Sequence, residues 1–226
     1  MSVVRRALTV ALLPLGNRVV TIRSGPLTGA RMELDLAHEK SFWNGSYEPD
    51  VVEIVSRFDL GGKRVWDVGA HAGYFSLLFA RRGAEVVAFE ANPHNAARLR
   101  SNVARNAAAV SVVEAAVNAE AGVVAFKLVP GRRRAQSSIS AEGNTRVKAV
   151  TLDDELDRLG MPYFVKMDIE GAELPALRAA PRLLAAKPIL LVEVHRGRRQ
   201  RAATAELLSE AGYTVEWVGW RILATT

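Results

Sequence analysis

The stretch VWDVGAHAGYF, residues 65–75, decides the fold class, because an apolar run leads into a glycine-rich turn and then into a helix-forming sequence. Gly69 and Gly73 let the backbone turn tightly and approach a ligand without an intervening side chain. Their spacing is Gly-x-x-x-Gly, whereas turns that bind a pyrophosphate follow Gly-x-Gly-x-x-Gly. A nucleoside ligand without a phosphate group therefore fits this turn better than a dinucleotide.

Short apolar runs alternate with amphipathic stretches around this turn. We expect strands at 65–68 and 86–89, and helices at 74–82 and 93–106. The two strands show no alternation of polar and apolar side chains, which is typical of strands buried on both faces of a sheet. Strands that alternate with helices in this way indicate an α/β protein with a parallel sheet.

The remaining elements are assigned from similar patterns. Further strands are expected at 111–117, 122–128, 145–151, 164–167 and 188–195, and an acidic helix begins at residue 152. Residues 213–218 and 220–224, separated by Gly219, are predicted to form a closing hairpin.

Residues 1–62 follow a different pattern. Short strands at 19–22 and 31–35 and a helix at 49–57 indicate a segment that covers the sheet. We therefore predict an N-terminal cover segment, residues 1–62, and a ligand-binding domain, residues 63–226.

The composition excludes several kinds of site. The 226-residue chain contains no cysteine, which excludes disulfides, thiolate metal ligands and a cysteine nucleophile. No apolar run approaches the roughly 20 residues that span a bilayer. Residues 3–16 weakly resemble a signal peptide, but Pro14 and Gly16 interrupt the apolar run, so we interpret them as a short covering element, with peripheral membrane contact as the alternative. We expect a cytoplasmic protein without a transmembrane segment.

The net charge is +6, and much of it lies in two basic runs, residues 132–134 and 196–201. Neither run contains interleaved aromatic side chains that could stack on bases, so nucleic acid is not an expected partner. We interpret both runs as solvated loops, with contact to an acidic substrate or phosphate group as the alternative.

A carboxylate follows the glycine-rich turn at a suggestive distance. Glu90 ends the next predicted strand and lies 23 residues after Asp67 (90 minus 67). A carboxylate at this position of a Rossmann-like fold can accept hydrogen bonds from both ribose hydroxyls. The alternative is a solvated strand end.

Five motifs occur in a fixed order: DVGAHAGYFS at 67–76, FE at 89–90, EAAV at 114–117, TLD at 151–153 and KMDIEGAE at 166–173. In this order they resemble the FkbM family of S-adenosylmethionine-dependent methyltransferases, over about residues 43–195. The sequence departs from the family pattern at His71, where Asn is usual, and at Ala91, where Pro often follows the glutamate. The resemblance implies a Rossmann-like class I methyltransferase fold: a mostly parallel seven-stranded sheet with helices on both faces and a C-terminal β-hairpin.

The resemblance also implies a cofactor, S-adenosylmethionine, and assigns residues to it. The turn would surround the methionine and ribose, Glu90 would hold the ribose, and Ala116 with Val117 would line the adenine pocket. Glu48, in a Tyr-Glu pair upstream of the turn, would complete a lid; from its position alone it is a helix-start carboxylate. The full expected set is Glu48, Asp67, Gly69, Ala70, His71, Gly73, Tyr74, Glu90, Ala91, Asn92, Ala116, Val117 and Asp168.

The reaction centre is expected where the loops after the strands converge, because ligands of parallel α/β sheets bind beyond the C-terminal ends of the strands. Methylation of an alcohol needs a base, and His195 is the candidate, with Asp168 as its partner. The alternative for His195 is a polar residue at the start of a basic loop. Residues 130–140 are expected to select the acceptor. The expected acceptor-binding residues are Gln136, Ser137, Ser138 and Glu170.

A divalent cation is possible at this centre but is not favoured. Carboxylates and imidazole could bind Mg²⁺ together with water and substrate oxygens. The residues that could take part are Asp168, Glu170, Glu173, Glu193 and His195, with Asp168, Glu193 and His195 as the main candidates. Glu173, in the first turn of a predicted helix, is interpreted as structural.

These observations predict an S-adenosylmethionine-dependent O-methyltransferase that acts on a small-molecule hydroxyl. The family resemblance implies a sugar, a polyketide or a related metabolite as the acceptor. One alternative is a nicotinamide-dependent oxidoreductase, although the glycine spacing does not suit it. The other is a cofactor-binding protein without catalysis.

Overall fold

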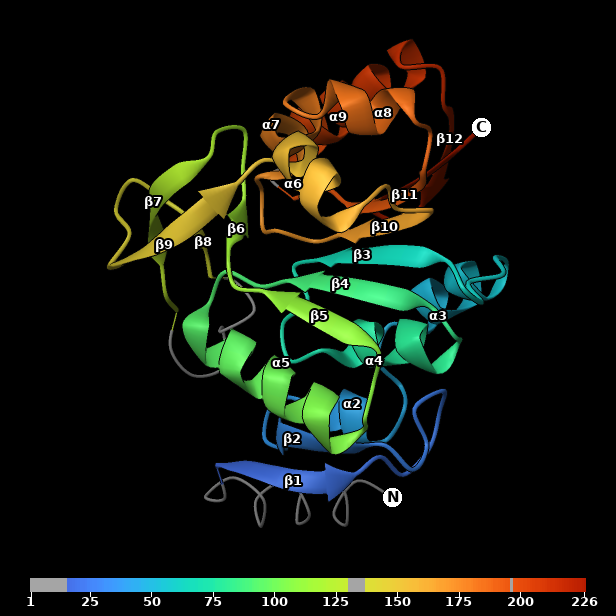
Figure 1. Cartoon of the computed structure of the whole chain (residues 1–226), viewed down its shortest axis with the longest axis vertical. Coiled ribbons are helices and arrows are strands. Elements are labelled where there is room, and N and C mark those ends of the chain that lie inside the picture. The colour runs from blue at the N-terminus through green and yellow to red at the C-terminus, as the bar shows by residue number, and fades with distance from the viewer. Residues whose placement is uncertain (1–15, 130–136, 196) are drawn as a thin grey trace.

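A central seven-stranded sheet organises the molecule (Figure 1). The computed structural model describes residues 16–129, 137–195 and 197–226. The strand order is β12-β13-β11-β10-β3-β4-β5. The bounds are β3 Arg64–Val68, β4 Glu85–Phe89, β5 Val110–Val113, β10 Phe164–Met167, β11 Ile189–Glu193, β12 Thr214–Val218 and β13 Arg221–Thr225.

The sheet is mostly parallel, as predicted. Strands β5, β4, β3, β10 and β11 pair in parallel, whereas β13 pairs antiparallel with both β11 and β12. The antiparallel pair β12–β13 is the predicted C-terminal hairpin. The predicted fold class is therefore confirmed.

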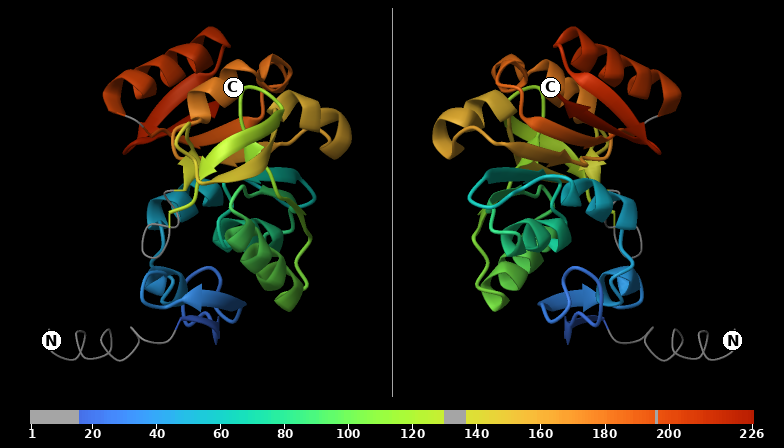
Figure 2. Two further views of the ribbon diagram at one scale, coloured as in Figure 1. Left: turned by 90° about the vertical axis from the view of Figure 1, so that its left-hand side faces the viewer. Right: turned by 90° about the vertical axis from the view of Figure 1, so that its right-hand side faces the viewer.

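Helices cover both faces of this sheet (Figures 1 and 2). Successive side chains of a strand point to opposite faces. Accordingly, Val65 of β3 packs into the core beneath the helix that follows the glycine turn, whereas Trp66 packs into the core on the other face. The helices on the first face are α3 Pro49–Ser56, α4 Tyr74–Arg81 and α5 Pro93–Arg105, and those on the second are α6 Leu152–Leu159, α7 Glu173–Arg178, α8 Pro181–Ala185 and α9 Gly197–Glu210.

The predicted strand 111–117 is wrong in extent, because the chain leaves the central sheet within it. Strand β5 ends at Val113, and β6, Ala116–Val117, pairs with β9 in a second sheet of order β6-β9-β7-β8. Ala116 and Val117 are buried in this second sheet, so the change of partner keeps both side chains out of water. The other strands of this sheet are β7 Gly122–Lys127, β8 Ser138–Ile139 and β9 Thr145–Val150.

The N-terminal segment packs beneath α5 and contributes to the same core as α4 (Figure 1). It contains β1 Asn17–Thr21, β2 Arg31–Asp35 and α2 Lys40–Trp43. Asn106 exchanges two hydrogen bonds with the backbone of Arg31, at 2.8 and 2.9 Å, and Asn102 accepts one from the Glu33 N–H at 2.6 Å. Side chains of α5 thus bond to the edge of β2.

Two expectations concern parts of the chain that the structure does not describe. Residues 3–15 of the predicted covering element and the basic run 132–134 lie outside the described residues. The second basic run was predicted to be a loop, and this is wrong, because residues 197–201 form the start of helix α9. Within the described residues, no helix has the length and apolar character needed to cross a membrane. The cytoplasmic location and the lack of nucleic-acid binding stay predictions.

The amide of Asn102 yields a stability prediction. Asn102 is fully buried, and it bonds the Glu33 N–H at 2.6 Å and the Ala72 carbonyl at 2.9 Å. Asn102→Leu leaves both backbone groups unpaired, so we expect the free energy of unfolding to fall by about 2–4 kcal/mol in urea titrations. Asn17→Ala, at an exposed site, is the control and should change it by less than about 0.5 kcal/mol. Equal stabilities of the two variants would contradict this assignment.

Candidate active site

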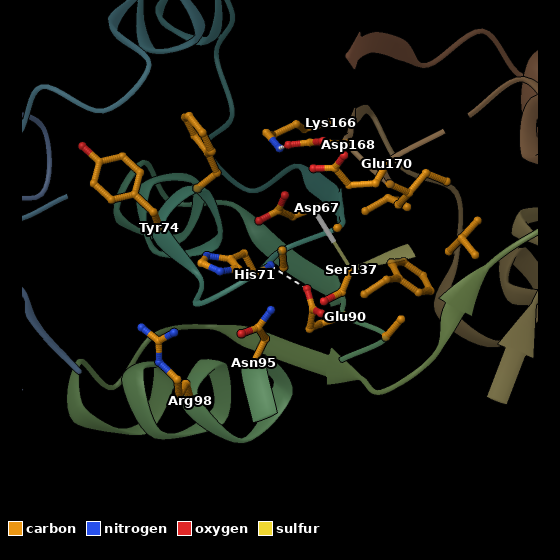
Figure 3. A pocket seen from close by; sticks show the side chains of 18 of the residues that line it. Asp67, His71, Tyr74, Glu90, Asn95, Arg98, Ser137, Lys166, Asp168 and Glu170 are labelled. Carbon is orange, nitrogen blue, oxygen red and sulfur yellow. Dashed lines mark hydrogen bonds and ion pairs between the residues drawn. The ribbon is translucent and has the colours of Figure 1, made fainter. Parts of the chain in front are cut away.

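A cavity of about 220 Å³ lies at the C-terminal ends of β3, β4 and β10 (Figure 3). Its wall is formed by the ends of three parallel strands that are adjacent in the sheet, and by the N-terminal segment, which contributes Phe42 and Tyr47. Part of the wall is apolar, with Phe126 and Ile139 from the second sheet. A cavity at this edge is where parallel α/β sheets bind their ligands.

The glycine-rich turn has the conformation that its sequence predicts. Gly69 and Gly73 have φ of 89° and 90°, in the left-handed region that favours glycine. A Cβ atom on Gly69 would lie 1.8 Å from the carbonyl oxygen of Asp168, and one on Gly73 would lie 2.5 Å from Leu99 Cδ1. Gly69 lines the cavity, whereas Gly73 packs against α5. Gly73 therefore permits close packing, and the structure does not place it on the cavity wall.

Glu90 is held rigidly at the cavity wall. Its carboxylate accepts a hydrogen bond from the His71 N–H at 2.7 Å (Figure 3) and another from the Asn92 N–H at 2.8 Å. Burial raises the pKa of Glu90 to about 7, although these backbone hydrogen bonds and the nearby Asn95 amide act in the opposite direction. Asn92 does not line the cavity: its backbone N–H orients Glu90, and its side chain caps α5 by accepting from the His94 N–H at 3.0 Å.

Several buried polar atoms on the cavity wall have no hydrogen-bond partner among the described residues. They are Asp67 Oδ1, Tyr74 Oη, Asn95 Oδ1 and Arg98 Nε. A buried polar atom without a partner is costly, at about 1–3 kcal/mol. Two of these atoms are acceptors and one is a donor, while the tyrosine hydroxyl is both. They fit a ligand that carries amino, hydroxyl and carboxylate groups, as S-adenosylmethionine does.

The ionisable side chains of the wall are mostly acidic. The carboxylates are Asp35, Glu39, Asp67, Glu90, Asp168 and Glu170, whereas the long basic side chains are Arg98 and Lys166. Both cations are already paired: Arg98 lies 2.5 Å from Glu39, and Lys166 lies 3.6 Å from Asp168. The remaining charge favours a cationic ligand and disfavours a pyrophosphate. A sulfonium cofactor therefore suits the cavity better than a nicotinamide dinucleotide.

Four carboxylates surround His195 beside this cavity. Its Nδ1 lies 2.8 Å from Glu173 Oε1, and its Nε2 lies 3.8 Å from Asp168, 3.6 Å from Glu170 and 3.7 Å from Glu193. Burial disfavours the imidazolium, but the hydrogen bond to Glu173 and the neighbouring charges outweigh burial and raise the pKa of His195 to about 9. The imidazole therefore carries a proton at neutral pH, and the base role expected of His195 requires the loss of that proton.

Most of the expected residues meet at the cavity. Those on its wall are Asp67, Gly69, Ala70, His71, Tyr74, Glu90, Ala91, Ala116, Val117, Ser137, Asp168 and Glu170. Ser138 instead pairs with Lys127 in the second sheet, and Gln136 lies outside the described residues. Glu48 forms an ion pair with Arg221 at 3.1 Å and makes no side-chain cap hydrogen bond to α3. Glu48 thus stands at the start of α3, as its position in the sequence indicates, but its carboxylate pairs with Arg221 and does not cap the helix.

Several polar residues of the wall were not predicted from the sequence. Lys166 is buried, and its ammonium lies 5.1 Å from the ring centroid of Phe75. A lysine inside the otherwise apolar strand FVKM was the available signal, because a buried charge needs a specific partner. Asn95 and Arg98 lie one turn apart on α5, and no local pattern marks them as ligand-facing.

Comparison with known proteins assigns the family. The model of the methyltransferase FkbM domain matches residues 67–215. The chain belongs to the FkbM methyltransferase family. It is 29% identical to the hexuronic acid methyltransferase AglP of Haloferax volcanii over 171 residues. The aligned region covers 75% of this chain and 71% of AglP.

A solved methyltransferase structure shows the same fold. Precorrin-6y C5,15-methyltransferase from Geobacter metallireducens superposes with a TM-score of 0.54 at 19% identity, covering 84% of this chain and 93% of that one. A SAM-dependent methyltransferase from Aquifex aeolicus has a TM-score of 0.47 at 15% identity, covering 77% and 88%. The FkbM assignment confirms the predicted S-adenosylmethionine-dependent methyltransferase and does not support the oxidoreductase alternative.

Glu90 gives a prediction for cofactor binding. If its carboxylate accepts the ribose hydroxyls, Glu90→Gln should weaken S-adenosylmethionine binding by roughly 10-fold or more, because a charge-assisted bidentate interaction becomes a neutral one. Calorimetric titration measures this change. Parent affinity should also rise with pH through about 7 as the carboxyl ionises, and the variant should lose this dependence. A variant that binds as tightly as the parent would rule out the ribose contact.

The same group predicts the pH dependence of stability. The folded-state pKa of Glu90, about 7, lies above its ordinary value of 4.5. The unfolded chain therefore ionises first as the pH rises, so the free energy of unfolding should fall between pH 4.5 and 7 and then level off. Relative to Glu90→Gln, the ligand-free parent should lose up to about 3 kcal/mol over this range. Denaturant titrations of both proteins across this pH range would test the prediction. If the free energy of unfolding changes with pH by the same amount in both proteins, the prediction is wrong.

Proposed function

We propose that this enzyme transfers the methyl group of S-adenosylmethionine to a hydroxyl oxygen of a sugar or a related small molecule. One observation carries the proposal: the cavity joins the buried carboxylate of Glu90 to the acidic cluster that includes Asp168 and Glu170. A single ligand can therefore lie against the carboxylate of Glu90 while its reactive end faces the acidic cluster at Asp168 and Glu170. The relative AglP is described as a hexuronic acid methyltransferase, which supports a sugar acceptor.

We propose one direction for the cofactor in the cavity. Glu90 would accept the ribose hydroxyls, and the apolar wall at Ala116, Val117 and Phe126 would enclose the adenine. The unpartnered Asp67 Oδ1 would accept from the ammonium group; the other oxygen of this carboxylate already accepts from Ser76 Oγ at 2.6 Å. This direction brings the sulfonium toward the C-terminal end of β10.

Asp168 and His195 are our proposed catalytic pair. The acceptor hydroxyl attacks the methyl carbon in line with the carbon–sulfur bond. That bond breaks as the new carbon–oxygen bond forms, and S-adenosylhomocysteine leaves as a neutral thioether. The hydroxyl proton passes to the carboxylate of Asp168, which lies at the cavity wall, and the imidazole of His195, 3.8 Å behind it, stabilises that carboxylate.

Acceptor selection is assigned to the second sheet and its loop. Ser137 lies on the cavity wall, and its hydroxyl accepts from the Val129 N–H at 3.0 Å. We propose that this part of the wall contacts the acceptor, together with Ser138, Gln136 and Glu170. Small-molecule acceptors, and not nucleic acids, are the proposed partners.

A transfer assay tests the proposal. Isotope-labelled S-adenosylmethionine is incubated with hexuronic acids and neutral hexoses, and the label on the sugar is counted. Asp168→Asn should lower kcat by roughly 100-fold, the scale of a lost proton-transfer group. Asp157→Asn is the control, because Asp157 is an exposed residue of α6 that pairs with Arg182.

The products separate the possible acceptors. A methyl ether survives alkaline treatment, whereas a methyl ester formed on a carboxylate is hydrolysed. Label that remains on the sugar after alkali supports hydroxyl methylation, and label that is released contradicts it. An Asp168→Asn protein as active as the parent would remove Asp168 from the reaction.

A further inference from the structure

The ends of β10 and β11 bring one imidazole and two carboxylates to a common point beside the cavity. Asp168, Glu193 and His195 each offer one ligand atom, and these atoms all lie within 4.8 Å of one another. His195 Nε2 lies 3.8 Å from Asp168 Oδ1 and 3.7 Å from Glu193 Oε1, too far for hydrogen bonds. The three groups therefore face one another across a gap.

The imidazole of His195 is fixed from behind. Its Nδ1 bonds to Glu173 Oε1 at 2.8 Å, so Nε2 is the nitrogen that points toward the gap. A carboxylate on the far nitrogen is the usual second contact of a metal-binding histidine. Glu173 is fully buried, and its Oε2 has no hydrogen-bond partner among the described residues. A cation bound at Nε2 would replace the proton that the imidazole otherwise carries there, and it would keep a positive charge beside this buried carboxylate.

The two carboxylates are also fixed from behind, each by a different cation. Arg221 Nε bonds to Glu193 Oε2 at 2.8 Å, and Lys166 Nζ lies 3.6 Å from Asp168 Oδ2. Both basic groups are buried, so they restrict the rotation of the carboxylates. The other oxygen of each carboxylate, Oδ1 of Asp168 and Oε1 of Glu193, faces His195 Nε2 across the gap. Three separate contacts thus hold the facing atoms in place.

We propose that Asp168, Glu193 and His195 bind one divalent cation of the Mg²⁺ or Mn²⁺ class. Adjacent ligands of such an ion lie roughly 3 Å apart, so closing the gap requires side-chain movements of about 1 Å. Two carboxylates and one imidazole suit these hard or borderline ions and leave coordination positions open. Asp168 belongs to both the gap and the cavity wall, so an open position can face the cavity.

The role of the cation rests on the proposed function. Neighbouring oxygens of a sugar can chelate the ion through its open positions, which places one hydroxyl next to the sulfonium methyl group. The ion polarises that hydroxyl and eases the loss of its proton. With Asp168 and His195 serving as ligands of the ion, the proton passes instead to the carboxylate of Glu170, whose Oε2 lies 3.6 Å from His195 Nε2 and whose side chain lines the cavity.

Binding of Mn²⁺ tests the site directly. The full chain is treated with EDTA, dialysed and titrated with Mn²⁺ while the free ion is followed by electron paramagnetic resonance. We expect one ion per parent chain, and roughly 10-fold or more weaker binding by His195→Ala and by Glu193→Gln. The control is Glu85→Gln. Glu85 is the first residue of β4, at the end of the strands away from the cavity, so this variant should bind Mn²⁺ as the parent does.

The outcomes separate this proposal from the proposed function. A parent without a stoichiometric Mn²⁺ site, or folded variants that bind Mn²⁺ as the parent does, would overturn the cation site; far-ultraviolet circular dichroism establishes folding. Methyl transfer that is lost on chelation and restored by Mn²⁺ supports the catalytic role, whereas full transfer after chelation overturns it. Mn²⁺ bound at this site, with no methyl transfer to any acceptor, would instead contradict the proposed function.

Discussion

The close approach of Gly69 to the backbone of Asp168 is the constraint on which the site depends. No side chain could stand at residue 69, because its Cβ would lie 1.8 Å from the Asp168 carbonyl oxygen. Strands β3 and β10 are neighbours in the sheet, and this contact keeps the loops that leave them in contact too. The cofactor turn and the acidic cluster thereby share one cavity. A methyl donor and its acceptor have to meet within bonding distance, so this backbone contact is a geometric condition for the reaction.

Burial and charge then divide the cavity into functions. Glu90 lies in a dry part of the wall, where two backbone N–H groups orient its carboxylate. Asp168 lies where several carboxylates are only half-buried, and the ammonium of Lys166 lies 3.6 Å from it and 5.1 Å from the ring centroid of Phe75. The first environment suits recognition of neutral hydroxyls, and the second suits a transient positive charge or a proton in transit. The acidic excess also gives a physical reason why a sulfonium, and not a pyrophosphate, fits.

Local sequence predicted the part of the site that a strand, a turn and a helix determine. Gly69 and Glu90 fall into this class, because tight turns and strand ends have short-range signatures. The break in the strand at residue 113 was missed because it depends on pairing with β9, far along the chain. The role of Asn95 and Arg98 depends on the N-terminal segment that closes the cavity below them. The surroundings of His195 were only partly predicted, since its charge depends on carboxylates from other elements.

Asn102 links two parts of the molecule that have different tasks. One end of its amide holds the backbone of β2, and the other holds the carbonyl of Ala72 inside the cofactor turn. The N-terminal hairpin and the turn are therefore joined by the hydrogen bonds of one buried side chain, a buried joint between the two segments. Since a ligand that tightens the turn also tightens this joint, the amide proton of Glu33 should exchange with solvent more slowly in the cofactor complex than in the free protein. The segment that looks like a passive cover would thus report, from outside the cavity, whether the cofactor is bound.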